Sequence, residues 1–382
     1  MKNSILIILL SMSLLACNPS NGEGEVKQVE AETTFGDSLS DLNLPDGFEI
    51  AVYADDVPNA RSMAMSSGGV LYIGTRNEGK VYAVKDSDGD NVAEQKYVLA
   101  KDLKMPNGVA YRDGSLYVAE ISRLTRFDNI DNQLENPGQG VEIYDDYPTD
   151  QHHGWKYIAF GPDGKLYVPV GAPCNICESK DERFASITRM NADGSDREIF
   201  ASGVRNTVGF TWDSEGNMWF TDNGRDLLGD NMPPCELNKA TKAGNHYGYP
   251  YCHGGDIADP EFGSKYPCSD FEAPARKLGP HVAPLGLKFY TGDMFPPEYN
   301  GSLIIAEHGS WNRSRKIGYR LMQVKVENGR AVSYDVFVDG WLDEKAQEAW
   351  GRPVDVLVMK DGSILVSDDK AGKIYRISYK GA

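Results

Sequence analysis

One phrase recurs six times along the 382-residue chain, and this repeat limits the possible folds more than any other feature. Each copy is a turn containing glycine, followed by an apolar run rich in β-branched and aromatic residues. The copies are SSGGVLYIGTR, YRDGSLYVAE, GPDGKLYVPVG, DSEGNMWFTDNG, YNGSLIIAEHG and MKDGSILVSDD, with glycines Gly69, Gly114, Gly164, Gly216, Gly301 and Gly362. Intervals of 45 to 85 residues leave room for four short strands and a loop. The sequence therefore predicts an all-β six-bladed β-propeller, because a sandwich or an eight-stranded barrel would need fewer turns.

The widest interval, between Gly216 and Gly301, contains a segment rich in proline and glycine from Pro233 to Pro284. This segment is too long to be a plain connector. We therefore expect a long insertion between the fourth and fifth blades. Loops of this kind on a rigid scaffold often hold a functional site.

The N-terminus is typical of an exported protein. Residues 1–16 hold one lysine and an apolar run too short to span a bilayer, which predicts a signal peptide. The ending Leu14-Leu15-Ala16-Cys17 resembles a bacterial lipobox and implies lipidation of Cys17, although a plain signal with an incidental cysteine is the alternative. Residues 17–42 are poor in large apolar side chains, so we expect a flexible tether before a propeller domain at 43–382. Asn18 favours attachment, through Cys17 alone, to the outer membrane of a Gram-negative bacterium, facing the periplasm.

Charge and cysteine content narrow the possible partners. The formal net charge of -17 argues against a nucleic-acid partner, which would require a basic face, but it allows a local basic pocket for a small anion. An exported chain favours disulfides, and two pairs of cysteines are close in sequence, Cys174 with Cys177 and Cys252 with Cys268. Cys235 is left over. Two cysteines alone are too few for a closed zinc site, so disulfides are favoured over metal binding.

Polar residues recur where the strand before each glycine turn begins. These first residues are expected to face the axis of the propeller, and they are Arg61, Asn107, His153, Arg205 with Asn206, and Arg352. A ring of arginines in an acidic protein predicts a pocket for a flat anionic ligand, because guanidinium groups match carboxylates and stack on flat rings. The alternative is that the arginines cap main-chain carbonyls at strand ends. A zinc site at His152 and His153 is disfavoured, because neighbours on a strand point to opposite faces.

Six longer motifs carry a resemblance to a known family. They are HHGWKYIAFGPDGKLYVPVGAPCNIC, GVRNTVGFTWDSEGNMWFTDNGRDLLGD, HYGYPYCHGG, VAPLGLKFYTG, IAEHGSWNRS and WGRPVDVLVMKDGSILVSDD. From about Leu44 to Tyr379 the chain resembles the soluble glucose and sorbosone dehydrogenases that use pyrroloquinoline quinone (PQQ), and the L-sorbosone dehydrogenase-like branch most of all. The resemblance implies a six-bladed propeller, a quinone held over the axial channel by basic residues, and a calcium ion on the oxygens of the quinone.

The resemblance also implies roles for individual residues. His153 corresponds to the general base that takes the proton of a sugar's anomeric hydroxyl, with His152 lining the cleft. Arg205 corresponds to a residue beside both the reacting atoms and the quinone. The carbonyls of Gly224 and Arg225 match ligands of the catalytic calcium, which polarises the reacting carbonyl. The remaining implied contacts are Arg61, Asn107, Asn206, His308, Trp311, Arg313 and Arg352 for the cofactor, and Glu236 and Tyr247 for a second, structural calcium.

Two positions depart from the glucose-oxidising members of the family. Val354 stands where those members have a second arginine, two residues after Arg352. Gly171-Ala172 stands where they have Gly-Asp, whose aspartate orients the histidine. We therefore expect a main-chain carbonyl or Asp150 to orient His153.

The sequence predicts a PQQ- and calcium-dependent dehydrogenase that oxidises an aldose or sorbosone-like sugar at C1. Its electrons would go to the quinone pool or to a cytochrome c. No GxGxxG follows a predicted strand, which disfavours a nicotinamide enzyme. The alternatives are a calcium-dependent lactonase or other hydrolase, which would need side-chain carboxylates around an axial metal, and a non-catalytic sugar-binding propeller. Asp86-Ser-Asp88-Gly-Asp90 with Glu94 is expected to be a solvated hairpin tip, because its glycine is misplaced for an EF-hand loop.

Overall fold

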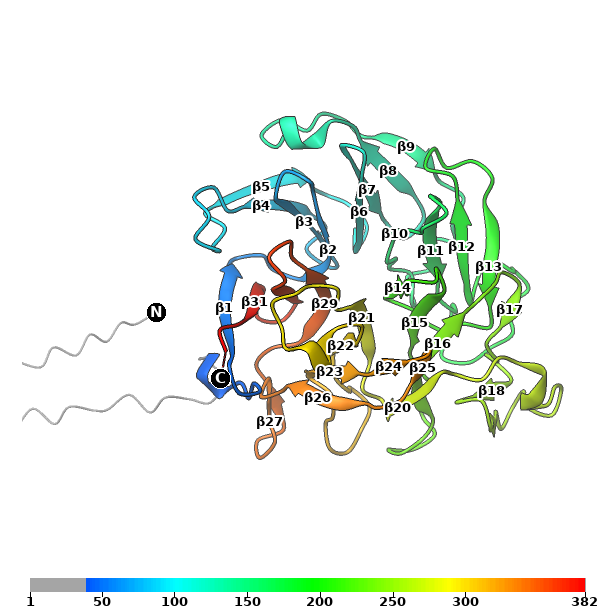
Figure 1. Cartoon of the computed structure of the whole chain (residues 1–382). Helices are drawn as coiled ribbons and strands as arrows, with labels where there is room; N and C mark the ends of the chain where they lie inside the picture. The colour runs from blue at the N-terminus through cyan, green and yellow to red at the C-terminus, as the bar shows by residue number, and fades with distance from the viewer. Residues whose placement is uncertain (1–38, 382) are drawn as a thin grey trace, which may run out of the picture. The chain divides into compact units, whose positions relative to one another are not determined.

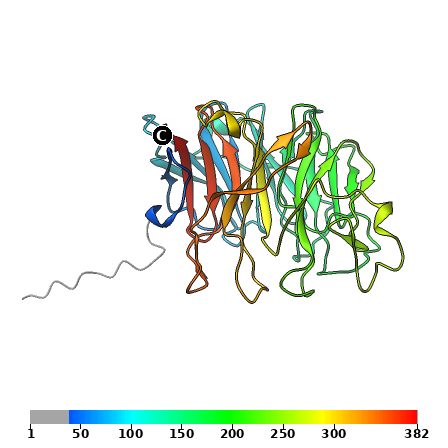
Figure 2. The ribbon, with the colours of Figure 1, turned by 60° about the horizontal axis from the view of Figure 1, so that its bottom comes forward.

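The computed structural model describes residues 39–381 and arranges them as six main sheets around a common axis (Figure 1). The predicted signal peptide and Cys17 lie outside the described residues. Each sheet has four antiparallel strands, and the third carries a short fifth strand. Figure 2 shows the strands standing side by side, with loops at both of their ends. The six-bladed propeller predicted from the repeat is confirmed.

The first three blades follow the chain in order. The first blade contains β2 (Ala60–Met65), β3 (Val70–Thr75), β4 (Val81–Lys85) and β5 (Gln95–Ala100). The second contains β6 (Gly108–Arg112), β7 (Ser115–Ala119), β8 (Leu124–Phe127) and β9 (Val141–Tyr144). The third contains β10 (Ala159–Phe160), β11 (Leu166–Val170), β12 (Ser186–Met190) and β13 (Glu198–Ser202).

The last three blades include longer loops. The fourth contains β14 (Phe210–Trp212), β15 (Met218–Asp222), β16 (Pro234–Ala240) and β20 (Arg276–Pro280). The fifth contains β21 (Pro284–Phe289), β22 (Leu303–Glu307), β23 (Arg320–Val324) and β26 (Asp335–Val338). The sixth contains β29 (Pro353–Val358), β30 (Ile364–Asp368), β31 (Lys373–Tyr379) and, from the start of the chain, β1 (Phe48–Ala54).

Shorter elements decorate this ring. The small strands are β17 (Asn245–His246), β18 (Cys252–His253), β19 (Ile257–Ala258), β24 (Val326–Glu327), β25 (Arg330–Ala331), β27 (Leu342–Asp343) and β28 (Glu348–Ala349). The helical turns within residues 39–381 are η1 (Leu39–Asp41), η2 (Ile130–Asn132), η3 (Cys268–Asp270) and η4 (Pro297–Tyr299). In this part of the chain no helix has the length and hydropathy that crossing a bilayer requires.

Strand β1 closes the ring by pairing with the last strand of the chain. It runs antiparallel to β31, with Phe48 opposite Tyr379, so both ends of the described chain meet in the sixth blade. This pairing leaves no open seam between the first and last repeats. Leu42 is buried in the adjoining core, so packing against the propeller begins just before the predicted domain boundary at residue 43.

The repeat reflects a turn that needs glycine, and the blades pack through apolar faces. All six repeat glycines adopt positive φ, for example 83° at Gly69 and 86° at Gly362. Only glycine reaches this region without a steric penalty.

Between the fourth and fifth blades, Trp219 is fully buried, and its ring lies edge-on to Phe289. Burying one large apolar side chain stabilises the fold by roughly 1.5–3 kcal/mol, so blade contacts of this kind hold the ring together.

The long insertion is located differently from the prediction. Residues 241–275 leave from β16 and return to β20, so the insertion lies inside the fourth blade rather than between the fourth and fifth. The glycine repeat marks one hairpin per blade and does not show which later loop is long. Within the insertion, β17 pairs in parallel with β13, which ties the insertion to the third blade.

The predicted disulfides are confirmed. Cys174 is bonded to Cys177, and Cys252 is bonded to Cys268. Of the cysteines within residues 39–381, Cys235 is free, and it is buried. The carboxylates of Asp86, Asp88, Asp90 and Glu94 meet at a hairpin tip between β4 and β5. Several of these carboxylates accept hydrogen bonds from nearby main-chain N–H groups of the same tip.

Candidate functional site

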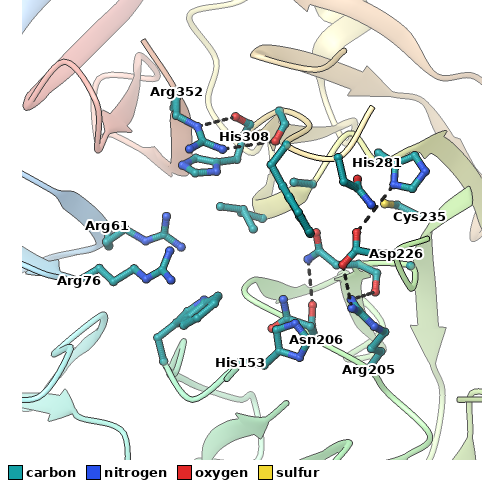
Figure 3. Close-up of a pocket in the computed structure, with 18 residues that line it drawn as sticks. Arg61, Arg76, His153, Arg205, Asn206, Asp226, Cys235, His281, His308 and Arg352 are labelled. Atoms are coloured by element: carbon teal, nitrogen blue, oxygen red, sulfur yellow. Dashed lines mark hydrogen bonds and ion pairs between the residues drawn. The ribbon is translucent and has the colours of Figure 1, made fainter. Parts of the chain in front are cut away.

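Loops at one end of the blades line a central cavity of about 320 Å³. Figure 3 shows arginines entering it from several sides, with His153 and Asn206 facing them. We call it the axial cavity. Of the residues predicted to form the site, the structure brings Arg61, His153, Arg205, Asn206, Gly224, His308, Trp311 and Arg352 into its wall. The convergence of arginines from separate blades that the sequence predicted is therefore present.

His153 is oriented by a main-chain carbonyl. Its Nδ1 lies 2.9 Å from the carbonyl oxygen of Ala172. A carbonyl can only accept, so Nδ1 carries the hydrogen and Nε2 keeps a free lone pair. Ala172 is the residue at which the resemblance implies an aspartate in the glucose-oxidising members. Of the two orienting groups that we expected, the structure selects the main-chain carbonyl, not Asp150.

Close packing of the backbone holds this histidine in place. His153 adopts a φ of 51°, which is uncommon for a residue with a side chain. A Cβ atom added at Gly171 would lie 2.5 Å from the Cβ of His153. Burial, followed by the charge of Arg205, lowers the pKa of His153 to about 2. The imidazole is therefore neutral at pH 7 and able to accept a proton.

A buried ion network holds Arg61. Its Nη1 donates to Asp369 at 2.8 Å and its Nε donates to the Asn107 side chain at 2.7 Å. His308 Nε2 lies 2.8 Å from the same carboxylate of Asp369. Burial lowers the pKa of His308 to about 4, so this ring is also neutral at pH 7. Asn107 was predicted to touch a cofactor, but it lies behind Arg61 and outside the cavity wall, where its Nδ2 donates to the Lys156 carbonyl.

Arg205 and Arg352 donate some of their hydrogen bonds to main-chain carbonyls. Arg205 donates to the carbonyl and the side chain of Asn175, both at 2.9 Å. It also pairs with Asp226 at 3.3 Å (Figure 3). Arg352 donates to the carbonyl of His308 at 3.2 Å. The alternative interpretation, in which arginines cap main-chain carbonyls, thus holds for some of the N–H groups of each guanidinium. Their positive charges nevertheless face the axial cavity.

Three wall residues that sequence reasoning missed have unpaired polar atoms. Arg76 Nε, Trp155 Nε1 and Asn312 Oδ1 are buried without a hydrogen-bond partner. The Arg76 guanidinium lies 3.9 Å above the ring of Trp155. Buried polar atoms of this kind nearly always have a partner, so these atoms are suited to a polar ligand.

A positional signal for part of this set was present in the repeat. The residue seven places after each repeat glycine is Arg76, Ile121, Gly171, Asn223, His308 or Asp369. Of these, Arg76, Asn223 and His308 line the axial cavity, and Asp369 contacts two wall residues. In the first, fourth, fifth and sixth blades, the residue just after the second strand therefore lies in the cavity wall or contacts it.

The residues predicted to bind calcium fall into two places. Gly224 lines the axial cavity beside the Asp226 carboxylate, and within residues 39–381 the carbonyls of Gly224 and Arg225 accept no hydrogen bond. The side chain of Arg225 is buried against Asp259 in the insertion. Oxygen atoms of this kind suit a hard divalent cation.

The second predicted calcium pair lies outside the axial cavity. Glu236 and Tyr247 line a separate space of about 10 Å³, which is the room of roughly one water molecule. Glu236 accepts hydrogen bonds from the N–H of Gly254 and from Asn238. Burial and the nearby Asp222 raise the pKa of Glu236 to about 7. A structural calcium at this place stays a prediction.

Trp311 and Arg313 were both predicted to contact the cofactor, but the structure places them differently relative to the axial cavity. Trp311 lines the cavity but is 72% exposed, so it stands at the rim. Arg313, predicted to touch the cofactor, is not in the wall. Its guanidinium donates to the carbonyl of Asp230 and to the side chain of Asn231. That prediction is corrected: Arg313 anchors the rim loop to the loop after β15.

The charge of the wall favours an anion. The described wall residues include the four arginines Arg61, Arg76, Arg205 and Arg352, but only one carboxylate, Asp226. A polyanionic flat molecule together with one divalent cation matches this set. A hydrolase built on a carboxylate-ringed axial metal does not.

Comparisons with known proteins show the family of the chain. A family model described as TrAA12-like matches residues 42–380. A protein of Borreliella burgdorferi is 33% identical over 359 residues, which cover 89% of this chain and 92% of that protein. The pyrroloquinoline quinone-dependent pyranose dehydrogenase of Coprinopsis cinerea is 23% identical, over 88% of this chain and 54% of the enzyme. This chain thus spans about half the length of that relative.

Solved structures show the same fold. The holo form of the PQQ domain of the Coprinopsis cinerea pyranose dehydrogenase has a TM-score of 0.77 at 19% identity, over 88% of this chain and 97% of that chain. The PQQ-bound aldose sugar dehydrogenase of Streptomyces coelicolor has a TM-score of 0.65 at 20% identity, over 88% of this chain and 100% of that chain. The relationship to PQQ-dependent sugar dehydrogenases that the motifs predicted is confirmed.

Proposed function

Because the chain belongs to the TrAA12-like family, we propose that it is a PQQ- and calcium-dependent sugar dehydrogenase acting at C1 of an aldose or sorbosone-like sugar. The observation that carries this proposal is the meeting of four arginines and a neutral histidine around one cavity. The cavity also suits the cofactor, because Arg76 Nε and Trp155 Nε1 are buried donors without a partner in the protein. Both are placed to donate to oxygens of an anionic ring.

The residues of the chain divide the work of binding and proton transfer. Arg61, Arg76 and Arg352 would hold the carboxylates of PQQ, and the carbonyls of Gly224 and Arg225 would hold calcium. When bound, PQQ supplies a two-electron acceptor for the hydride of the sugar. His153 Nε2 takes the proton of the anomeric hydroxyl as the C1–H bond breaks. Its Nδ1–H, held by the Ala172 carbonyl at 2.9 Å, keeps Nε2 available. The sugar leaves as a lactone or the corresponding acid.

An anion bound in the axial cavity would also help His153 to act as a base. The low pKa of about 2 in the free protein reflects burial and the positive Arg205. An anion bound among the arginines would offset that charge and raise the pKa toward the working pH, where a general base is most effective. The electron acceptor proposed for the following step is the quinone pool or a cytochrome c.

The experiment is a titration of the purified apoprotein with PQQ and calcium. We expect quenching of tryptophan fluorescence, since Trp155 and Trp311 line the cavity, and aldose-dependent reduction of an artificial dye. His153→Ala should lose about two or more orders of magnitude in turnover while still binding PQQ, and His152→Ala should lose far less. Lactone hydrolysis without dye reduction would support a hydrolase instead.

We also propose that the protein is exported and anchored through Cys17 to the outer membrane, facing the periplasm. The support is the lipobox-like ending of residues 1–16. Expression with radiolabelled palmitate should label the wild-type protein and leave Cys17→Ser unlabelled and released from the membrane fraction. Equal labelling of both would contradict this proposal.

A further inference from the structure

A second cavity of about 360 Å³ lies beside the axial cavity. We call it the side cavity. One wall is the loop from Ala172 to Ala185, which includes Phe184, and the opposite wall is the insertion, which contributes His246, Tyr249 and Tyr251. Its volume falls within the range of ~300–1,000 Å³ that small-ligand pockets occupy. None of the roles assigned above uses it.

The disulfide loop Cys174–Cys177 forms the partition between the two cavities. On one side Asn175 accepts hydrogen bonds from Arg205 of the axial wall. On the other side the N–H of Cys177 donates to the Tyr249 hydroxyl at 3.1 Å, and Cys177 itself lines the side cavity. Ala172 touches both sites, because its carbonyl holds His153 and the residue also lines the side cavity.

The aromatic side of the side cavity is rigid. The ring of Tyr251 lies nearly parallel to Phe271, with centroids 5.8 Å apart and planes at 8°. His246 packs on the same ring at 4.7 Å. The Tyr251 hydroxyl donates to Glu178 at 2.7 Å, which joins the insertion to the disulfide loop. Rigid aromatic faces suit the apolar C–H face of a sugar ring.

The opposite side offers hydrogen-bond acceptors whose charges are mostly balanced. Glu178 is paired with Lys265, and Asp181 is paired with Arg183 at 2.6 Å. Glu182 lies exposed on the same loop. Paired carboxylates attract a free cation weakly but still accept hydrogen bonds from hydroxyl groups. The lining therefore suits a neutral polyhydroxylated ring better than an amine.

We propose that the side cavity binds a further sugar ring of the substrate, so that the protein oxidises the reducing end of a short oligosaccharide. This rests on the proposed dehydrogenase function, because the ring to be oxidised would occupy the axial cavity. The disulfide loop is the ridge over which the saccharide passes. The insertion, which supplies the aromatic wall, is then a specificity element for chain length.

The test measures binding of cellotriose, maltotriose and glucose to the purified apoprotein by saturation-transfer NMR and calorimetry. Ser179→Trp places a bulky ring in the side cavity, and Glu182→Gln removes a charged acceptor without changing shape. Ser195→Trp, in a turn of the third blade away from both cavities, is the matched control. We expect at least one trisaccharide to bind, about tenfold more weakly in each side-cavity variant and unchanged in the control.

The outcomes separate this proposal from the proposed function. Equal trisaccharide affinity in the wild type and both side-cavity variants, or no trisaccharide binding to the wild type, would overturn the side-cavity proposal. With PQQ and calcium present, kcat/KM should fall in the variants for the trisaccharide and stay constant for glucose. Because apoprotein binding needs no redox chemistry, side-cavity binding without dye reduction would count against the dehydrogenase function alone.

Discussion

Replacing Gly171 with alanine tests the way in which His153 is held. A Cβ at this position would lie 2.5 Å from the Cβ of His153 and 2.8 Å from its carbonyl oxygen. Both distances are far below van der Waals contact, so the backbone that carries His153 has to move by roughly 1 Å. A displacement of that size at a reacting group costs about 100-fold in rate. Overpacking of this kind also costs about 1–3 kcal/mol of stability.

The assay compares turnover, PQQ affinity and Tm of Gly171→Ala with those of Gly68→Ala. At Gly68 the added Cβ meets its nearest atoms at an ordinary 3.6 Å, so that variant should behave like the wild type. We expect Gly171→Ala to lose about two orders of magnitude in kcat while PQQ binding by fluorescence changes little. Wild-type turnover in a folded Gly171→Ala protein would refute the idea that close packing against Gly171 positions the base.

Three further predictions concern stability. Asp369→Asn leaves the buried guanidinium of Arg61 without its charged partner, so urea unfolding should show a loss of about 3 kcal/mol, and a loss below 1 kcal/mol would contradict the buried pair. The pKa of His308 is lowered from 6.5 to about 4, so only the unfolded chain takes up its proton between these values. The wild type should therefore lose up to about 3 kcal/mol relative to His308→Gln as the pH falls from 6.5 to 4, and a constant difference would contradict a neutral His308. Replacing Cys252 and Cys268 with serine opens a loop with a sequence separation of 16, which should lower the free energy of unfolding by about 3 kcal/mol, and an unchanged urea midpoint would contradict this.

The blade count was predictable because the repeat records a local requirement. A tight turn needs glycine at positive φ, and the apolar run that follows has to be buried on both faces. The insertion was misplaced because Gly216 and Gly301 bracket several loops, any of which could have been the long one. No pattern in the sequence of residues 241–275 predicted that β17 would pair with β13 of the third blade.

That the first residues of the first strands face the axis was predictable, but how far their side chains reach was not. Arg61 and Asn107 begin equivalent strands, yet only the longer side chain reaches the cavity, and the shorter one supports it at 2.7 Å. Arg313 was misassigned because its partners, Asp230 and Asn231, lie 83 and 82 residues away in sequence. Asp369 was missed because its role is to bind Arg61 and His308, two wall residues from different blades that are far from it in the sequence.

The claim that four arginines form one anion-binding cavity is tested most directly by the PQQ affinity of Arg76→Met. The Nε of Arg76 has no protein partner, so the substitution breaks no hydrogen bond at that atom. It removes the cation–π contact with Trp155, which should cost about 1 kcal/mol and lower Tm by only a few degrees. By calorimetry in the presence of calcium, we expect one PQQ per wild-type chain and a Kd that is about 10- to 100-fold weaker in the variant, as for the loss of a charged hydrogen bond. A Kd equal to that of the wild type, or no PQQ bound to the wild type, would contradict the account.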